Sequence, residues 1–461
     1  MLSTDLAEWA ATVTLEQIPG SVRSAASRSI LDSVGTAIAA RRLGRASAPW
    51  QVAHSLGGPA EARPLTGADA ISAPAATLAT GALVHALDFD DTHPVALVHP
   101  TAVSLPAALC VGQQQSASGC EVFVATVVGL EVVCRLGAAS PHGFHARGLH
   151  ATAVAGTLSS ALVTARLMGL SVQQMIDALG IAGSASGGLL EFLDTPADTK
   201  SLHPGSAGMN GVLAARLSAA GATGPSSVIE GRRGLYAALS ARDVDTRSVT
   251  RDLGTGWVFP ATGIKPYPSC QLMHVALDAV AQALVQTHGT EGVCQVGNVA
   301  SVEVDVHIDS VPIVCPTRGG GAVPSSEYAA KFDLPWSVAA LIADGEISVS
   351  TYSTTSVARK EIAELATRVR VIPIDTSGNA ADAPGRAVVR FTDGSSAEAS
   401  VTGSRGSRAR PMSDSDVYAK FVSNCGDQPQ TAELADRILQ LVDEPGLSAV
   451  LELAFRHSSF E

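Results

Sequence analysis

The chain has few charged residues: Asp, Glu, Lys and Arg make up 16% of its 461 residues, against 46% hydrophobic residues. So small a charged fraction predicts a large interior and further apolar surface that is covered in a homodimer. The net charge of −12 argues against nucleic acid or an anionic membrane as a partner. A small anionic substrate stays compatible with this charge, because locally clustered cations outweigh a net charge.

The chain also lacks the cysteine pattern of secreted proteins. Its seven cysteines are odd in number and form no CxxC pair, so we interpret them as buried thiols of a reducing compartment. Residues 2–11 include Asp5 and Glu8 and have neither the basic nor the apolar region of a signal peptide. The most apolar run, residues 122–136, is interrupted by charges and is too short to span a bilayer. We therefore expect a cytoplasmic protein.

The first half of the chain consists of one helical pattern after another, rich in Ala and Gly. Apolar residues recur at helical spacing, and the small side chains permit close packing in a bundle. We expect helices over residues 22–40, 77–87, 103–113, 120–138, 151–167, 172–181 and 210–220. Near the other end Ser413 is typical of an N-cap, and the helical pattern returns after it.

The pattern changes after Lys265, where valines alternate from Val302 to Val306 as in a half-buried strand. The Asp393-Gly394 pair is a hairpin signal between two further strands. The expected strands cover residues 299–308, 366–374, 387–391 and 396–402. The expected helices of this region cover residues 271–286 and 334–343.

These patterns predict the fold class. We expect a mostly α protein, with a large all-helical domain built from both chain ends and a smaller α+β lid domain. The helical domain takes residues 1–264 and a return segment 401–461, and the lid takes residues 265–400. The length is consistent with two or three domain-sized units.

The segment HALDFDDTH at residues 85–93, with HPTA at 99–102, places carboxylates and imidazoles between two apolar helices. Such crowding shifts the pKa values of both groups, as acid–base chemistry near neutral pH requires. A calcium loop starting at Asp88 would need Gly and Glu where His93 and His99 stand. For zinc, the spacing of these two histidines indicates no third ligand. We expect an active-site wall without a metal.

Three histidines each precede a helix start of small residues: His99, His150 and His203. Helix N-termini present free N–H groups and a positive dipole end, so three of them could converge on a polycarboxylate. The alternative, that these histidines only end loops, carries about equal weight.

Cations occur beside these segments. Arg147 lies close to His150, and Lys200 lies in a loop where it can pair with an anionic substrate. Lys265 and Tyr267 lie in the proline-fixed motif KPYPSC at residues 265–270, at the expected domain junction. For each of these residues a solvated or purely structural role is the alternative, and for Cys270 a structural thiol is favoured.

In these motifs the chain resembles the MmgE/PrpD family, whose activities include 2-methylcitrate dehydratase, cis-aconitate decarboxylase and iminodisuccinate epimerase. The resemblance rests on residues 85–93, 99–102, 147–157, 199–205, 265–270 with His274, 327–339 and 411–421. It implies a helical domain with an α+β lid, a homodimer, and no metal or organic cofactor. It also implies that the pocket is lined by Asp88, Thr92, His99, His150, Lys200 and Lys265.

The chain departs from two branches of that family. Cys270 stands where relatives of the decarboxylase type have His, and Arg318 where they have Tyr. The form DFDDTHP at residues 88–94 differs from the DFNDTW-like form of the propionate-pathway dehydratases. The resemblance therefore leaves both substrate assignments open.

We predict a cofactor-independent hydro-lyase that removes a proton next to a carboxylate and dehydrates a 2-methylcitrate-like hydroxy-polycarboxylate. The alternatives are an epimerase of an iminodisuccinate-like dicarboxylate, a cis-aconitate-type decarboxylase, a metal-dependent hydratase and a catalytically silent dimeric scaffold. The expected catalytic residues are His99, His150, Asp88 and Lys200. The expected substrate-binding residues are Thr92, Arg147, His203, Lys265, Tyr267 and Arg318.

Overall fold

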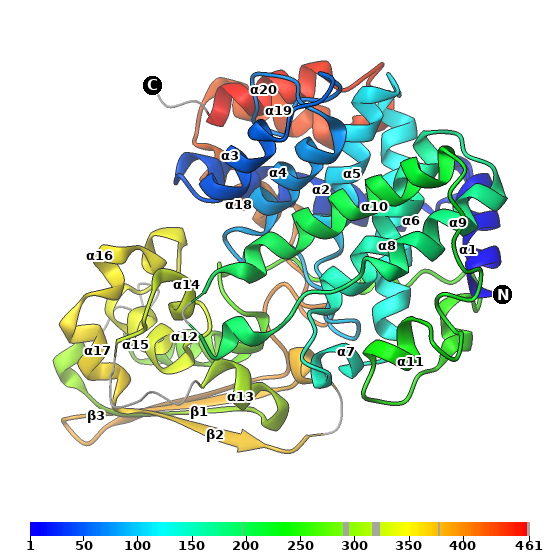
Figure 1. The fold of residues 1–461 in the computed structure, drawn as a ribbon. Coiled ribbons are helices and arrows are strands. Elements are labelled where there is room, and N and C mark those ends of the chain that lie inside the picture. The colour runs from blue at the N-terminus through cyan, green and yellow to red at the C-terminus, as the bar shows by residue number, and fades with distance from the viewer. Residues whose placement is uncertain (196, 289–294, 316–322, 377–378, 459–461) are drawn as a thin grey trace. The chain divides into compact units, whose positions relative to one another are not determined.

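A computed structural model describes residues 1–195, 197–288, 295–315, 323–376 and 379–458. The predicted fold class is confirmed, because these residues form mostly α-helices and one small sheet (Figure 1). The chain divides into two compact units. The first comprises Met1–Leu190, Thr199–Ile264 and Ser413–Glu461, and the second comprises Glu191–Asp198 and Lys265–Met412. The boundaries of independently folding domains stay a prediction.

The first unit is helical throughout, and every helix predicted in it is present. Its helices are α1 (Leu2–Thr12), α2 (Gly20–Arg42), α3 (Ser47–Ser55), α4 (Ala73–His85), α5 (Pro100–Gln114), α6 (Gly119–Ala138), α7 (Gly143–Ala146), α8 (Ala151–Leu167), α9 (Val172–Ser184), α10 (His203–Ala219), α11 (Leu235–Leu239), α18 (Asp414–Cys425), α19 (Pro429–Leu439) and α20 (Ser448–Ser458). Helix α10 begins at His203 instead of the predicted residue 210, so this histidine lies on the helix itself.

Helices α4, α5, α8 and α10 form the centre of this unit, and α8 packs against α5, α6, α9 and α10. Every residue of α4 is buried, as expected of a helix that is apolar on all sides. Small residues let the backbones approach closely. A Cβ atom on Gly81 of α4 would lie 2.7 Å from the Cα of Gly205 in α10. A larger residue at Gly81 would therefore push α4 and α10 apart, together with the histidines at their ends.

The C-terminal helices return to the N-terminal ones, as the sequence predicts. The Ser413 hydroxyl accepts a hydrogen bond from the Asp416 amide at 3.1 Å and opens α18 as the predicted N-cap. Helix α18 packs against α2, as do α19 and α20, and Figure 1 shows the red C-terminal helices on the side of the blue helix α2. Between them the Lys420 ammonium contacts the buried Asp32 carboxylate at 2.6 Å and donates to the Phe89 carbonyl at 2.8 Å. The C-terminal segment thus holds the loop that follows α4.

The second unit contains a four-stranded sheet in the order β2-β1-β3-β4. Its strands are β1 (Val299–His307), β2 (Val369–Ile374), β3 (Gly385–Phe391) and β4 (Ser396–Val401), which confirms the four predicted strands. Strand β1 pairs in parallel with β2 and antiparallel with β3, an arrangement that the sequence pattern did not indicate. The alternating residues Val302, Val304 and Val306 are fully buried.

Helices pack on this sheet and complete the second unit: α12 contacts β1, β3 and β4, and α15 contacts β2. The helices of this unit are α12 (His274–His288), α13 (Val311–Val314), α14 (Glu327–Ala330), α15 (Leu334–Asp344), α16 (Thr354–Val357) and α17 (Lys360–Ala366). The predicted helices over residues 271–286 and 334–343 correspond to α12 and α15.

The cysteine prediction is only partly right. Of the cysteines in the described ranges, Cys110, Cys134, Cys270 and Cys425 are buried. Cys120 and Cys315 are partly exposed, so for these two the expected burial is wrong. Cys294 lies outside the described residues. Within those ranges, the helices are all too short or too polar to traverse a lipid bilayer.

Candidate active site

The loop after α4 carries the first part of the site. Helix α4 ends at His85, and the chain turns back at Asp88, whose φ of 52° is left-handed and whose amide donates to the His85 carbonyl at 3.1 Å. Aspartate tolerates this conformation better than most residues. The three carboxylates Asp88, Asp90 and Asp91 that follow are fully buried. Such burial of charge is costly unless each group is paired, so their partners define the site.

His85 and Asp90 form a buried pair within this loop. The Nδ1 atom of His85 lies 2.8 and 3.0 Å from the two carboxylate oxygens of Asp90, and both side chains are fully buried. Since a carboxylate accepts, Nδ1 carries the proton and donates it. The Nε2 atom of His85 is also buried and has no hydrogen-bond partner in the part of the chain that the structure describes. In the neutral ring this Nε2 therefore holds an unused lone pair.

His99 is the N-cap residue of α5, and three contacts fix it. Its Nδ1 lies 2.9 Å from the carbonyl oxygen of Asp91 and 3.2 Å from the hydroxyl of Thr92, and its amide donates to the Thr152 hydroxyl of α8 at 3.1 Å. Because a carbonyl only accepts, Nδ1 carries the proton, and the lone pair of the neutral ring is at Nε2. The backbone thus sets a tautomer with a basic Nε2.

Lys200 lies in the short helical turn Thr199–Leu202 that leads into α10. Its ammonium donates to the Asp88 carboxylate at 2.7 Å, and only 7% of Lys200 is exposed. So short a contact between a lysine and a carboxylate is a charge-assisted hydrogen bond. The pair therefore places an ammonium group in the interior, beside the imidazoles.

The three predicted helix starts do come together. His99 and His150 are the N-cap residues of α5 and α8, and His203 is the first residue of α10. The ring centroid of His150 lies 5.8 Å from that of His99 and 5.3 Å from that of His203. His85 adds a fourth ring, 4.5 Å from His99. We call these four rings, with Asp88, Asp90 and Lys200, the buried cluster.

The buried cluster keeps several imidazoles neutral. Burial lowers the pKa of His150 well below its usual 6.5, and the nearby Lys200 ammonium adds to this effect. Burial likewise lowers the pKa of His203 to about 4 and that of the neighbouring His145 to about 3. The Nδ1 atoms of His150 and His203 lie 3.1 Å apart, so one ring donates to the other. These rings are bases, not acids, at neutral pH.

Asp91 behaves in the opposite way. Burial raises the pKa of this carboxyl to about 7, against the hydrogen bonds from Thr101, whose hydroxyl lies 2.6 Å from Oδ2. The charges of Asp90 and Asp32 raise the pKa further. A buried carboxyl that titrates near neutral pH, next to neutral imidazoles, is the kind of arrangement found at functional sites.

The sequence analysis did not assign a role to His85, Asp90 or His145. The spacing of His85 and Asp90 within one motif was a usable signal, because a helix that ends between them turns the chain back on itself. His145 lies in α7, and its ring is 6.2 Å from that of His150. No spacing rule connects it to the other histidines, so only the fold reveals it.

Other predicted residues lie elsewhere. Thr92 contacts His99 and belongs beside the cluster, whereas Arg147 is exposed at the end of α7. Lys265 and Tyr267 belong to the second unit; Lys265 is 1% exposed, and the Tyr267 hydroxyl donates to Asp278 at 2.8 Å. Burial raises the pKa of Tyr267, which therefore stays a neutral phenol. Their predicted roles in binding substrate stay predictions.

Arg318 lies outside the described residues, so its predicted role is also untested. Cys270 fits the favoured structural interpretation, because it is buried and its amide donates to the Lys331 carbonyl at 2.9 Å.

Two overlapping groups in the buried cluster have the donor atoms of a metal site. One nitrogen from each of His85, His99 and His150 lies within 4.8 Å of the others. The same holds for one donor atom from each member of the set His85, Asp88, Asp90 and His99. Sequence spacing concealed the first group, because its members come from three separate helix ends.

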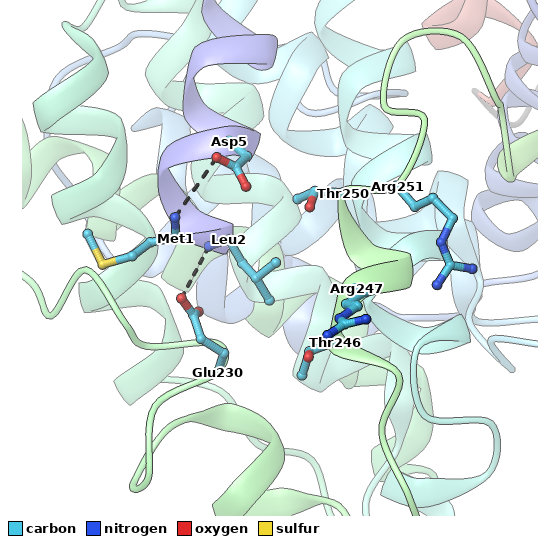
Figure 2. Close-up of a pocket in the computed structure, with 8 residues that line it drawn as sticks. All are labelled: Met1, Leu2, Asp5, Glu230, Thr246, Arg247, Thr250 and Arg251. Atoms are coloured by element: carbon cyan, nitrogen blue, oxygen red, sulfur yellow. Dashed lines mark hydrogen bonds and ion pairs between the residues drawn. The ribbon is translucent and has the colours of Figure 1, made fainter.

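A shallow hollow of about 400 Å³ lies at the N-terminus of the first unit, as Figure 2 shows. There the Leu2 amide donates to Glu230 at 3.2 Å, and Arg247 and Thr250 line the other side. None of the residues that line this hollow belongs to the buried cluster. Its open, mixed surface has no convergent buried groups, so the candidate active site is the buried cluster.

A helical unit with a histidine-rich buried cluster and a smaller α+β unit together define a class of protein, and the whole chain was compared with known families on that basis. Residues 4–247 match the MmgE/PrpD N-terminal domain and residues 267–444 match the MmgE/PrpD C-terminal domain. The chain therefore belongs to the MmgE/PrpD family.

Three similar proteins are named as cis-aconitate decarboxylases or as a protein like them. The chain is 26% identical to a cis-aconitate decarboxylase of Aspergillus terreus, across 98% of this chain and 95% of that protein. It is 27% identical to the cis-aconitate decarboxylase of Mus musculus, across 76% of this chain and 71% of that protein. The chain is 24% identical to the cis-aconitate decarboxylase-like protein oryM of Aspergillus oryzae, across 98% of this chain and 97% of that protein. These matches support a lyase-type function at the level of the family.

Proposed function

We propose that this protein is a cofactor-independent lyase that moves a proton at a carbon next to a carboxylate of a small di- or tricarboxylate. Such a C–H group is weakly acidic, so catalysis needs a base and a cation that stabilises the developing enolate-like charge. The buried cluster offers both. The observation that carries the proposal is the buried Lys200–Asp88 pair near His150, whose pKa is lowered by burial and by the lysine together.

The base in this proposal is His99. Its Nδ1 proton is held by the Asp91 carbonyl, so the Nε2 lone pair is the one that takes the substrate proton. Lys200 stabilises the negative charge that develops on the substrate, and Asp88 holds the ammonium in position at 2.7 Å. His150 lies beside His99, and its lowered pKa keeps this second imidazole neutral.

The finer reaction that the geometry favours is dehydration. The C–H bond breaks and its proton goes to His99, while the C–O bond breaks and the leaving hydroxide takes a proton from the Lys200 ammonium to leave as water. The electron pair of the C–H bond forms the new C=C bond. This order begins with a base, which matches imidazoles that burial keeps unprotonated at neutral pH. A 2-methylcitrate-like hydroxy-polycarboxylate is the substrate class that we propose.

The second candidate is decarboxylation of a cis-aconitate-like tricarboxylate, which the activity of the similar proteins favours. There the C–C bond to a carboxylate breaks, CO₂ leaves, and a carbon takes up a proton. That step begins with an acid. It therefore needs the bound carboxylates to raise the pKa of an imidazole that is neutral in the free protein.

The products distinguish these reactions. Dehydration creates a conjugated alkene that absorbs in the ultraviolet, decarboxylation of cis-aconitate releases CO₂, and epimerisation changes only optical rotation. Purified protein should be incubated with 2-methylcitrate, citrate, cis-aconitate and iminodisuccinate, and all three signals recorded. We expect the absorbance signal with a hydroxy-polycarboxylate. Release of CO₂ without that signal would replace dehydration by decarboxylation, and a change of rotation alone would make the protein an epimerase.

We further propose a cytoplasmic homodimer. The low charge content supports an interface, and α10 exposes Leu213 and Leu217 at 41% and 49%. Light scattering coupled to size-exclusion chromatography measures the mass directly. A mass of one chain at micromolar concentration would refute the dimer.

A further inference from the structure

Three imidazoles of the buried cluster have the donor arrangement of a metal site. One nitrogen each of His85, His99 and His150 lies within 4.8 Å of the others, and the three residues are 0%, 6% and 2% exposed. On a tetrahedral zinc ion, nitrogens at about 2.05 Å from the metal lie about 3.4 Å from one another. Small rotations of the three rings therefore suffice to meet one ion.

The rings are already oriented by partners of the kind that support metal ligands. The Nδ1 atom of His85 faces Asp90, that of His99 faces the Asp91 carbonyl, and that of His150 faces His203. Histidine ligands in metalloproteins commonly donate their other N–H to a carboxylate or carbonyl, which fixes the ring. With Nδ1 used in these hydrogen bonds, the proposed ligand atom of each ring is Nε2.

A second observation concerns His85 alone. Its ring is fully buried, yet among the described residues its Nε2 has no hydrogen-bond partner. A buried nitrogen without a partner costs free energy. A bound cation would satisfy this nitrogen in a way that the protein itself does not.

We propose that His85, His99 and His150 bind one divalent transition-metal ion of the zinc class, and that this ion inhibits the enzyme. Imidazole nitrogens suit Zn²⁺, Cu²⁺, Ni²⁺ and Co²⁺ and exclude Ca²⁺ and Mg²⁺, which require oxygen. The fourth position stays open to water or a substrate carboxylate.

The charges around the rings balance the ion. The Asp88 and Asp90 carboxylates each offer an oxygen within 4.8 Å of the donor nitrogens of His85 and His99. The Lys200 ammonium opposes the ion, but it is already paired with Asp88 at 2.7 Å. The rings themselves add no charge, since ligand histidines must be neutral.

Inhibition follows because the His99 lone pair cannot bind a metal ion and accept the substrate proton at the same time. A metal on His99 removes the base that takes the substrate proton, so turnover stops while the fold is retained. This second half of the inference rests on the proposed function, whereas binding of the ion does not. The two halves are therefore measured separately.

Binding is tested with Co²⁺, whose visible absorption is intense in four- or five-coordinate nitrogen sites and weak for the hydrated ion. Chelator-treated protein is titrated with CoCl₂, and Zn²⁺ is then added to displace the signal. We expect one Co²⁺ per chain in the wild type and loss of the intense band in the variants H85N and H150N. The control is H54N, because His54 is exposed and its ring contacts the Trp50 carbonyl and ring within its own helix.

The variants must keep the far-ultraviolet circular dichroism of the wild type, and H85Q provides a second replacement should H85N unfold. An intense band in folded H85N and H150N, equal to that of H54N, would place the metal elsewhere and overturn the site. Absence of the band in the wild type would overturn it as well. If Co²⁺ binds and no carboxylate is turned over, the site stands and the proposed function fails. Turnover unaffected by saturating Zn²⁺ overturns the inhibition.

Discussion

Two buried polar regions of the first unit contrast in how their charges are satisfied. In α6 the pair Glu131 and Arg135 is 0% and 2% exposed and is joined at 2.6 Å. Glu131 accepts from the amides of Val258 and Phe259, both at 2.9 Å, and Arg135 donates to four backbone carbonyls between residues 248 and 256. This pair binds a loop through its backbone. Nothing in it is left to react.

The buried cluster is satisfied differently. Several of its contacts run from side chain to side chain between separate elements, as in Lys200 to Asp88 and His150 to His203. The His85 Nε2 has no hydrogen-bond partner among the described residues, and Asp88 has a left-handed φ of 52°. Strain and unsatisfied groups at a buried site indicate function, whereas saturated backbone contacts indicate a structural role. Burial alone does not distinguish the two.

The largest expected effect separates the two regions by activity. K200A removes the cation that stabilises developing charge, so turnover should fall by about 10²–10⁴-fold while the fold is kept. H99A should show a similar loss. The matched control K360A removes an exposed lysine and should turn over like the wild type. Steady-state kinetics on proteins of equal circular dichroism make the comparison, and a wild-type rate for folded K200A would refute the role of Lys200.

E131A should give the opposite result. It leaves the Arg135 cation buried without its carboxylate, which should lower the free energy of unfolding by about 3–5 kcal/mol. Turnover per folded molecule should stay close to that of the wild type, since Glu131 contacts no member of the buried cluster. Urea unfolding provides the stability. If E131A lost activity as K200A does while remaining folded, the contrast between the two regions would be wrong.

A smaller effect concerns pH. Because His150 has a folded pKa well below 6.5, the unfolded chain takes up a proton below pH 6.5 that the folded chain does not. This contribution to stability is present above pH 6.5 and is lost as the pH falls. Asp91, with its pKa raised to about 7, contributes in the opposite direction.

Subtracting the free energy of unfolding of H150Q from that of the wild type removes the contribution of Asp91, because both proteins contain Asp91. As the pH falls from 6.5 toward 5, the free energy of unfolding of the wild type should fall more steeply than that of H150Q, by a difference that approaches about 1.4 kcal/mol per pH unit. Urea unfolding between pH 5 and pH 7.5 gives both slopes. Parallel curves would show that His150 is as easily protonated in the folded chain as in the unfolded one.

The smallest expected effect is that of R147A. The sequence predicts that Arg147 binds substrate, but its side chain is exposed. Solvent therefore screens any ion pair between Arg147 and a substrate carboxylate, and the pair contributes little binding free energy. We expect KM to change by no more than about fivefold. A rise in KM of a hundredfold would restore the sequence-based role and would indicate that the substrate extends out of the buried cluster.

The fold was largely predictable because the spacing of apolar residues and the residues that begin or end an element are local features of the sequence, and they agree with each other. The alternation of Val302, Val304 and Val306 and the N-cap at Ser413 each depend on a few neighbouring residues. The start of α10 was missed because Gly205 and Gly208 weaken the helical pattern, whereas the close contact of Gly205 with α4 requires glycine there. The parallel pairing of β1 with β2 depends on distant segments, and no local pattern carries it.

The site was predictable only in part for the same reason. Motifs at helix starts identified His99, His150 and Lys200 as residues of interest, but not which of their atoms meet. The partner of His85 is set by the turn at Asp88, and the tautomer of His99 by a backbone carbonyl. Both are properties of the folded loop. Burial, which lowers the pKa values of the histidines, is also invisible in the sequence.

Exchange of substrate hydrogen with solvent tests the central claim most directly. The protein is incubated in H₂O with the polycarboxylate that it turns over, labelled with deuterium at the carbon next to the carboxylate, and release of deuterium to the solvent is followed by NMR. We predict that the wild type releases deuterium as it turns the substrate over and that folded K200A and H99A do so at least a hundredfold more slowly. Turnover by the wild type with all the deuterium retained at that carbon would contradict proton transfer by the buried cluster.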